Sequence, residues 1–459
     1  MDKVGLSDKY KTYPEYKNIN LGWLSQIPIH WDVKKLKYLG ESIIGLTYAP
    51  ENVVGEGDGI LVLRSSNIQN KKLEFEDNVY VNKKIPGKLI TREGDILICA
   101  RNGSRALIGK NAQITKDVAG VSFGAFMSIF RSPYNNYLSN VFNSPLFEYQ
   151  SGSFLTATIN QLTTGNLNSF EIPLPTELER EKIANFLDHE TAKIDTLIDK
   201  QQQLIKLLKE KRQAVISHAV TKGLNSNVPM RDSGVEWLGE VPEHWDFVPI
   251  KHIVEIPVTD GPHETPNFID EGVPFISAEA VSAGKIDFKK IRAHISEEDN
   301  ERYSLKYSPK IHDIYMVKSG ATTGVTAIVE THVNFNIWSP LAVIRCKEDS
   351  SPYFVLNFMR SINFQEAVEL NWSFGTQQNI GMGVIENLIV TKPPLVEAIE
   401  IVENLKIKCS LYDSVIGKAL NQIDLMKERR TALISAAVTG KIDVREWIDL
   451  DVSVGKEEV

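Results

Sequence analysis

Two long segments of the chain carry apolar residues at every third or fourth position. They span residues 176–222 and 396–440, and Glu, Lys, Asp and Gln fill most positions between the apolar ones. A period near 3.5 residues is typical of a helix with one apolar stripe. Each helix would be about 65 Å long at 1.5 Å per residue. The residues expected in the two stripes are Ile183, Leu187, Ile194, Leu197, Ile198, Leu204, Ile205, Leu208 and Val215, followed by Val402, Leu405, Tyr412, Val415, Ile416, Ile423, Met426 and Leu433.

The same sequence pattern occurs twice along the chain. The segment from Trp23 to Val33 matches the segment from Trp237 to Phe247 at an offset of 214 residues. Both segments begin with Trp-Leu and contain Pro-x-His-Trp-Asp. The helix ends match as well, because Glu210–Thr221 resembles Glu428–Thr439 at an offset of 218. Two matches in the same order at nearly the same offset indicate a tandem duplication.

A helix of this length needs a partner for its apolar stripe. If the two halves are related by an approximate two-fold axis, the equivalent helices pack in opposite directions, so an antiparallel coiled coil is expected. Gln201 occupies a stripe position where the other copy has Ala419. Two interpretations of Gln201 carry equal weight: it fixes the register of the pair, or it faces the edge of the contact.

Short apolar runs bounded by Gly, Asn or Ser precede each helix, as strands do. They include residues 59–63, 95–99 and 125–130 in the first copy, with counterparts at 273–276, 313–317 and 341–344. Helical stretches near 137–150 and 352–370 and a Pro-containing stop complete each head. The predicted fold is α+β: a head at 1–175, a helix at 176–222, a second head at 223–395, a helix at 396–440 and a tail at 441–459.

Charge and composition narrow the possible functions. Residues 1–175 hold 19 Lys and Arg against 16 Asp and Glu, whereas residues 223–394 hold 14 against 23. Neither head has a generally basic surface, so a nucleic-acid contact would need local basic clusters. The three cysteines form no CxxC pair, and no metal site is expected. Without an apolar run of about 18 residues or a leader peptide, a cytoplasmic protein is expected.

No set of residues has the spacing of a catalytic site. Residues 103–111 resemble a phosphate-binding loop but carry five residues between the glycines and Asn111 where Ser or Thr is needed. His30 and His244 occupy equivalent repeat positions, which favours a structural role beside Trp31 and Trp245. The chain is therefore expected to bind rather than catalyse.

Polar and basic side chains gather where the predicted strands end. Arg can hydrogen-bond guanine, Asn or Gln adenine, and Ser or Thr phosphate or base. Ordinary loop polarity explains any one of these residues equally well, but matching loops with different side chains favour two-part recognition. The candidate DNA-binding residues are Arg64, Ser65, Asn67, Arg101, Asn102, Arg105, Lys110, Asn160 and Gln161 in the first head, and Ser277, Lys318, Ser319, Thr322, Thr323, Thr376, Gln377, Gln378 and Asn379 in the second.

Together these features resemble the specificity (S) subunit of type I restriction–modification enzymes. The resemblance rests on Gly94-Asp-Ile-Leu followed by Arg101-Asn-Gly, on Thr376-Gln-Gln-Asn-Ile380, on the Pro-rich helix entries and on the two long helices. It implies that each head reads one half of a split DNA site and that the helices set the gap. It also implies two methyltransferase subunits and restriction/translocase subunits as partners. AdoMet, ATP and Mg²⁺ would be bound by those partners, and this non-catalytic chain would bind none.

The second head departs from the pattern. Ile311-His-Asp313 stands where the first head has Gly-Asp, and Lys318 replaces Arg101. The first head has Asn160-Gln161-Leu162 in place of a clear Thr-Gln-Gln-Asn-Ile segment. A scaffold with two peptide-binding heads on a helical spacer is the alternative function, and an enzyme with an unrecognised active site is a further one.

Overall fold

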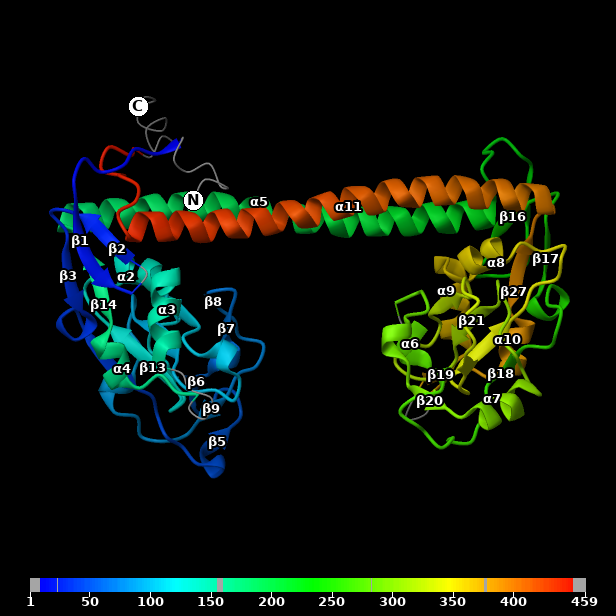
Figure 1. Cartoon of the computed structure of the whole chain (residues 1–459), viewed down its shortest axis with the longest axis horizontal. Coiled ribbons are helices and arrows are strands. Elements are labelled where there is room, and N and C mark those ends of the chain that lie inside the picture. The colour runs from blue at the N-terminus through cyan, green and yellow to red at the C-terminus, as the bar shows by residue number, and fades with distance from the viewer. Residues whose placement is uncertain (1–8, 23, 155–159, 282, 375–377, 449–459) are drawn as a thin grey trace. The chain divides into compact units, whose positions relative to one another are not determined.

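The computed structural model describes residues 9–22, 24–154, 160–281, 283–374 and 378–448 (Figure 1). Its contacts divide the chain into two compact units: unit 1 holds residues 1–201 and 421–459, and unit 2 holds residues 202–420. Each unit contains one head and a part of both long helices, α5 (Glu177–Lys222) and α11 (Leu395–Val438). The units are therefore divided within the helices rather than at the helix ends.

The head of unit 1, called head 1 below, is built on a four-stranded antiparallel sheet in the order β11-β10-β13-β4. A second sheet has the order β12-β6-β9-β5, in which β12 runs parallel to β6. The strands are β1 (Tyr16–Leu21), β2 (Leu24–Pro28), β3 (Asp32–Lys35), β4 (Glu41–Ile44), β5 (Val53–Val54), β6 (Ile60–Leu63), β7 (Ile68–Gln69), β8 (Lys72–Leu73), β9 (Tyr80–Val81), β10 (Ile96–Cys99), β11 (Asn111–Gln113), β12 (Ser122–Phe123), β13 (Met127–Arg131) and β14 (Glu171–Leu174). The α-helices are α2 (Asn135–Phe142), α3 (Pro145–Phe154) and α4 (Thr164–Ser169).

The head of unit 2, called head 2, repeats the main sheet in the order β22-β21-β24-β18. The register also repeats, because Ile96 lies opposite Phe130 in head 1 and Ile314 lies opposite Ile344 in head 2. The strands are β15 (Met230–Asp232), β16 (Glu240–Pro242), β17 (Asp246–Pro249), β18 (Thr259–Asp260), β19 (Val273–Ile276), β20 (Ala293–Ile295), β21 (Ile314–Val317), β22 (Thr326–Ile328), β23 (Asn336–Ile337), β24 (Leu341–Ile344), β25 (Ser373–Phe374), β26 (Gln378–Asn379) and β27 (Ile389–Lys392). The helices are α6 (Ala278–Val281), α7 (Glu297–Ser304), α8 (Pro352–Met359), α9 (Ile362–Asn371) and α10 (Met382–Asn387).

The strands that the sequence predicts are confirmed, because continuous apolar runs form the central strands. All four residues of β10, β21 and β24 are buried. Each predicted helical stretch is in fact two helices joined by a short corner. Pro145 opens α3, and the Ser361 hydroxyl caps α9 by accepting from the Phe364 N–H. A new helix start at these positions ends the preceding helix.

Within each unit the long helices run antiparallel. In unit 1, Asp195 of α5 forms an ion pair with Arg430 of α11 (3.0 Å), while Phe186, earlier in α5, packs against Trp447, beyond the end of α11. In unit 2, Arg212 pairs with Asp413 (3.0 Å). Asp413 and Arg430 are the repeat counterparts of Asp195 and Arg212 at the offset of 218. The duplication has therefore kept one ion pair twice.

The apolar stripe is mostly buried. Leu187, Ile194, Ile198, Ile205, Leu405, Ile423 and Leu433 are buried, and Leu208, Val215, Tyr412, Ile416 and Met426 are half-buried. The prediction is wrong for Leu197, Leu204 and Val415, which are 48%, 41% and 44% exposed. These three lie beside the seam on faces that the partner helix does not cover. Gln201 is half-buried and Ala419 is buried. No helix among the described residues is long and apolar enough to cross a membrane.

The two repeated histidines join the heads to the starts of the long helices. His30 Nε2 lies 2.8 Å from Glu179 Oε1, and His244 Nε2 lies 2.8 Å from Glu397 Oε2. The structural role predicted for both rings is thus confirmed, although its main partner is a helix carboxylate. His244 also packs against Trp245, whereas the ring of His30 contacts Tyr13.

Candidate nucleic-acid interface

In head 1, two polar loops that are distant in sequence lie side by side at the end of β10. The Leu162 N–H donates to the Ala100 carbonyl (2.7 Å), and Arg101 and Gln161 form an isolated antiparallel bridge. The Asn160 side chain donates to the Gly103 carbonyl (3.2 Å). The structure therefore brings together the two polar segments that the sequence singles out.

The loop after β6 joins the same cluster. The Asn102 amide donates to Ser65 Oγ (3.2 Å), and Lys110 Nζ donates to the Ser65 carbonyl (3.3 Å). The head 1 cluster consists of Ser65, Arg101, Asn102, Lys110, Asn160 and Gln161.

Arg101 is the cation in this cluster that is best placed to meet a ligand. Its side chain is exposed, and its guanidinium carbon lies 5.2 Å from the centre of the Phe126 ring, which is itself 59% exposed. Stacking on an aromatic ring orients a guanidinium without using its hydrogen-bond donors. Arg105 is also exposed, and it donates to the Gly152 carbonyl (3.4 Å).

Two of the predicted head 1 residues serve the loop itself. Asn67 is fully buried, and its amide donates to the carbonyls of Glu74 and Asp77. Arg64 forms an ion pair with Asp77 (2.7 Å). The interpretation of Asn67 as a DNA-contacting residue is corrected accordingly, because a side chain without exposed surface cannot reach a ligand unless the loop opens.

Head 2 repeats the loop pairing. The Ile380 N–H donates to the Lys318 carbonyl (2.9 Å), and Ser319 and Asn379 form the bridge that corresponds to Arg101 and Gln161. Gln378 and Asn379 are exposed, and Ser319 and Thr322 are half-buried. Thr376 and Gln377 lie outside the described residues.

The basic residue of this loop stands at a different position in each head. The shared bridge makes Ser319 the counterpart of Arg101 and Lys318 the counterpart of Ala100, so the expectation that Lys318 replaces Arg101 is wrong. Lys318 has a side-chain exposure of 12%, and its Nζ lies 3.3 Å from Asp260 Oδ2. Asp260 is fully buried and also contacts Lys306 Nζ (2.5 Å) and His263 Nε2 (3.0 Å). Lys318 is thus held inward by a buried carboxylate, whereas Arg101 faces solvent.

Two further head 2 predictions are corrected by burial. Ser277 is 4% exposed, and Thr323 is 9% exposed with its hydroxyl donating to the Gly320 carbonyl (2.7 Å). The Thr323 side chain thus supports its own loop, and Ser277 has too little exposed surface to meet a ligand. A hydroxyl that bonds its own turn is a common structural element.

Sequence reasoning missed Phe126 and the Asp260 group. Phe126 was expected inside the strand at 125–130, but the strand begins at Met127 and the Phe126 ring is exposed. Asp260 meets Lys306 and Lys318 only through the fold. The partners are 46 and 58 residues apart in the sequence, so no local sequence pattern predicts these contacts.

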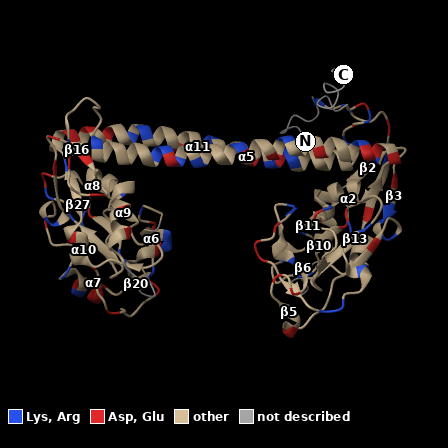
Figure 2. Ribbon diagram, turned by 180° about the vertical axis from the view of Figure 1, so that it is seen from behind, with Lys and Arg blue, Asp and Glu red and all other residues tan. Residues whose placement is uncertain are grey.

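The described residues hold no group of His, Cys, Asp or Glu that could bind a metal ion. Burial raises the pKa of the Cys99 thiol and raises that of Cys346 to about 12, so both stay protonated at neutral pH. Lys and Arg are interspersed with Asp and Glu along α5 and α11 and over both heads (Figure 2). The chemistry of the site is that of hydrogen-bond donors and acceptors on loops, which suits recognition.

Comparison with known proteins agrees with this reading. Residues 28–207 match the family model of the type I restriction modification DNA specificity domain. The chain is 25% identical over 436 residues to the EcoKI specificity subunit of Escherichia coli, covering 92% of this chain and 91% of that protein. It is 29% identical over 222 residues to the StySPI specificity subunit of Salmonella potsdam, covering 46% and 47%.

Solved structures share the fold. A chain from a structure of a type I restriction–modification system aligns with a TM-score of 0.67 at 16% identity, covering 91% of this chain and 99% of that chain. The HsdS subunit of Thermoanaerobacter tengcongensis aligns with a TM-score of 0.50 at 15% identity, covering 92% and 100%. The resemblance stated from the sequence is confirmed: over most of its length the chain is similar to type I restriction enzyme specificity subunits.

Proposed function

We propose that the chain is the DNA-recognition subunit of a type I restriction–modification complex. Head 1 reads one half of a split, asymmetric site and head 2 reads the other half. The observation that carries this proposal is the loop pairing found in both heads: the same backbone hydrogen bond, from Leu162 to Ala100 and from Ile380 to Lys318, joins loops with different side chains. A repeated frame with different polar residues suits two different base sequences.

The proposed contacts differ in kind between the heads. In head 1, Arg101 supplies a guanidinium that can bond guanine in two places, and Gln161 beside it supplies an amide. In head 2, the exposed amides of Gln378 and Asn379 take the leading part. Lys318 acts through its ion pair with Asp260 and positions the loop.

The two long helices are proposed to form an antiparallel coiled coil that relates the heads by a pseudo-two-fold axis and fixes the gap between the half-sites. Half-site spacing is then a geometric property of the protein. Two methyltransferase subunits are proposed to dock around the helices, with restriction/translocase subunits completing the nuclease. AdoMet, ATP and Mg²⁺ would be bound by those subunits, and this chain itself performs no catalysis.

Acidic charge in head 2 has a consequence for affinity. Residues 223–394 hold 23 Asp and Glu against 14 Lys and Arg, and contacts to phosphates supply much of the affinity for DNA. The isolated chain is therefore expected to bind DNA weakly, with the partners adding basic surface.

The test is to lengthen both helices and map methylation by the reconstituted complex. Seven residues inserted into each helix, between Gln201 and Gln202 and between Leu420 and Asn421, preserve the apolar period and add about 10 Å. The gap should grow by about three base pairs at 3.4 Å per base pair, while both half-sites stay the same. The matched control carries seven residues in the loop after α5, between Asn225 and Ser226, and should keep the original gap.

Changed half-sites with an unchanged gap would refute the spacer role. The alternative function, a scaffold with peptide-binding heads, predicts no duplex binding that weakens with salt and no effect of the complex on DNA methylation.

A further inference from the structure

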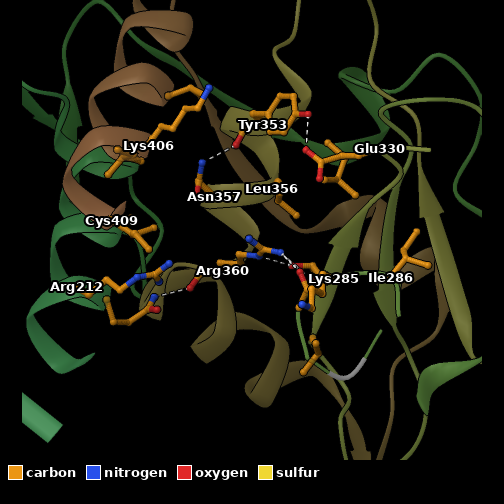
Figure 3. A pocket seen from close by; sticks show the side chains of 18 of the residues that line it. Arg212, Lys285, Ile286, Glu330, Tyr353, Leu356, Asn357, Arg360, Lys406 and Cys409 are labelled. Atoms are coloured by element: carbon orange, nitrogen blue, oxygen red, sulfur yellow. Dashed lines mark hydrogen bonds between the residues drawn. The ribbon is translucent and has the colours of Figure 1, made fainter. Parts of the chain in front are cut away.

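A cavity of about 960 Å³ lies in unit 2 between head 2 and the long helices (Figure 3). Its walls carry Arg212, Lys285, Arg360 and Lys406 against two carboxylates, Glu330 and Glu403. The lining thus has an excess of two positive charges, in a head whose overall charge is strongly negative. The volume lies within the range of small-molecule sites.

Arg360 is the central cation of this cavity. Its Nε and Nη2 atoms donate to Thr326 Oγ1 (3.3 Å), the Gly284 carbonyl and the Thr326 carbonyl (3.1 Å). Among the described residues it has no carboxylate partner, and its Nη1 atom takes no part in these hydrogen bonds. Burial and the nearby Arg212 lower the pKa of the guanidinium, and the carboxylate of Glu330 offsets only part of this effect. A confined cation of this kind is stabilised by an anion.

Unit 1 has a different arrangement of side chains at the equivalent place. Equivalent hydrogen bonds, Glu74 N–H to the Asn67 carbonyl and Asp287 N–H to the Ala280 carbonyl, align Lys71 with Gly284. Both residues have positive φ, 64° and 75°. The side chain at this position is therefore a lysine in one unit and absent in the other.

The corner between the two short helices aligns in the same way. Ser144 and Ser361 both donate to the carbonyl three residues earlier (2.6 Å each), so Asn143 corresponds to Arg360. In unit 1, Lys71 Nζ donates to the Asn143 carbonyl (3.2 Å), whereas in unit 2 Arg360 donates to the Gly284 carbonyl.

The hydrogen bond between the loop and the helix corner therefore has opposite directions in the two units: the loop donates in unit 1, and the corner donates in unit 2. In unit 1 a loop lysine spans the space next to Arg430. In unit 2 the loop has only Gly284, and a guanidinium from the opposite side lines the cavity next to Arg212, the counterpart of Arg430.

We propose that this cavity binds a small phosphorylated molecule, with Arg360 as its main contact. Lys285 and Lys406 are exposed and line the same cavity, and the described residues offer neither of them an ion-pair partner. A phosphate monoester carries nearly two negative charges, and Arg360, Lys285 and Lys406 are three cations of the lining for which the described residues show no ion pair. Its three oxygens can also meet several cations at once. Arg212 is paired with Asp413, so its electrostatic attraction for an anion in the cavity is reduced.

The ligand would touch the long helices through Lys406 and the head through Arg360. Its binding would hold head 2 in one orientation against the helices of its own unit. This site is independent of the proposed reading of DNA, because none of its cations belongs to the predicted readers.

The experiment is isothermal titration calorimetry of the full chain with AMP and with inorganic phosphate, at matched ionic strength. Saturable binding of one AMP per chain is expected with a dissociation constant below about 1 mM. The variants Lys406→Gln and Lys285→Gln alter only exposed side chains, and each should weaken binding at least fivefold. Arg360→Gln should abolish binding, with thermal unfolding used to confirm that this variant is folded.

The matched control is Lys71→Gln, which removes the corresponding cation of unit 1 and should leave the affinity for AMP unchanged. Competition by inorganic phosphate would show that the phosphate group alone is recognised, and binding of AMP only would show that a phosphorylated organic molecule is required. The proposal is overturned by the absence of saturable heat with either probe. The proposal is also overturned if the Arg360 and Lys406 variants bind AMP as tightly as the native chain. It is overturned as well if Lys71→Gln weakens AMP binding as much as those variants do.

Discussion

The junction between head 1 and the start of α5 depends on one buried carboxylate. Glu179 has a side-chain exposure of 6%, and it meets His30 (2.8 Å), Thr176 Oγ1 (2.8 Å) and Trp31 Nε1 (3.4 Å). Its counterpart Glu397 in unit 2 meets His244 at the same distance, but with side-chain exposures of 29% and 45% for the two partners. Both junctions contain the same His–Glu pair, but Glu179 is more deeply buried and accepts further hydrogen bonds from Thr176 and Trp31.

We predict that Glu179→Gln destabilises its junction by about 2 kcal/mol, because a neutral amide cannot accept all three hydrogen bonds in a buried site. This energy corresponds to a roughly 30-fold change in the opening equilibrium. Glu397→Gln should cost less than about 1 kcal/mol, or about fivefold, since water replaces part of the exposed contact. Hydrogen exchange of residues 177–187 and 395–405 measures the two junctions separately.

The pH dependence gives a second readout. Burial acts to raise the pKa of the Glu179 carboxyl, but hydrogen bonds from His30, Thr176 and Trp31 outweigh burial and lower the pKa below its usual 4.5. Because the folded-state pKa is the lower one, the stabilisation is present above pH 4.5 and is lost as the pH falls through the folded value. Protection of residues 177–187 should decline there in the native chain and stay level in Glu179→Gln. Equal losses for the two variants, or unchanged protection near Glu179, would refute the argument that burial and the added hydrogen bonds make the Glu179 junction the stronger one.

Three further predictions concern the reading loops and the helix pair. Arg101→Ala should weaken recognition of one half-site by about 1–3 kcal/mol in duplex binding by the complex, and a loss equal for all sequences would make Arg101 a phosphate contact. Asp260→Asn should lower the free energy of unfolding by about 3 kcal/mol in thermal or urea unfolding, because Lys306 and Lys318 lose their buried counter-charge; the exposed Asp270→Asn is the control, and a similar small change in both would contradict the assignment. Asp195→Arg should destabilise unit 1 by up to about 1 kcal/mol, since it faces Arg430, and adding Arg430→Asp should restore the loss in a double-mutant cycle. Simple additivity of those two changes would show that the two side chains do not interact.

The helices, the strands and the repeat could be predicted because each depends on local order in the sequence. The positions of Ile194, Ile198 and Ile205 follow from the period of a helix, and the buried run Ile96–Cys99 follows from its composition. The matching of Trp31 with Trp245 needs only the sequence. A period of 3.5 residues does not fix how wide a face the partner covers, and for this reason Leu197, Leu204 and Val415 are exposed instead of buried.

The candidate site could be predicted in outline only. The segments that hold Arg101 and Gln161 were found because polar residues follow strands, but their pairing through Ala100 and Leu162 depends on a contact across about 60 residues. Asn67 is a residue type that can contact DNA, but it is buried and bonds its own loop. Residue type alone cannot distinguish these two roles.

The sequence by itself thus determined that the chain is duplicated, that each copy carries a head and a long helix, and that the copies differ in their loops. Only the tertiary structure decided which polar residues face solvent. It also decided that Lys318 is held by Asp260, and that the cation between the loop and the helix corner is Lys71 of the loop in unit 1 and Arg360 of the corner in unit 2. The physical reason is range: periodicity and propensity act over a few residues, whereas burial and ion pairing depend on groups that only the folded chain brings together.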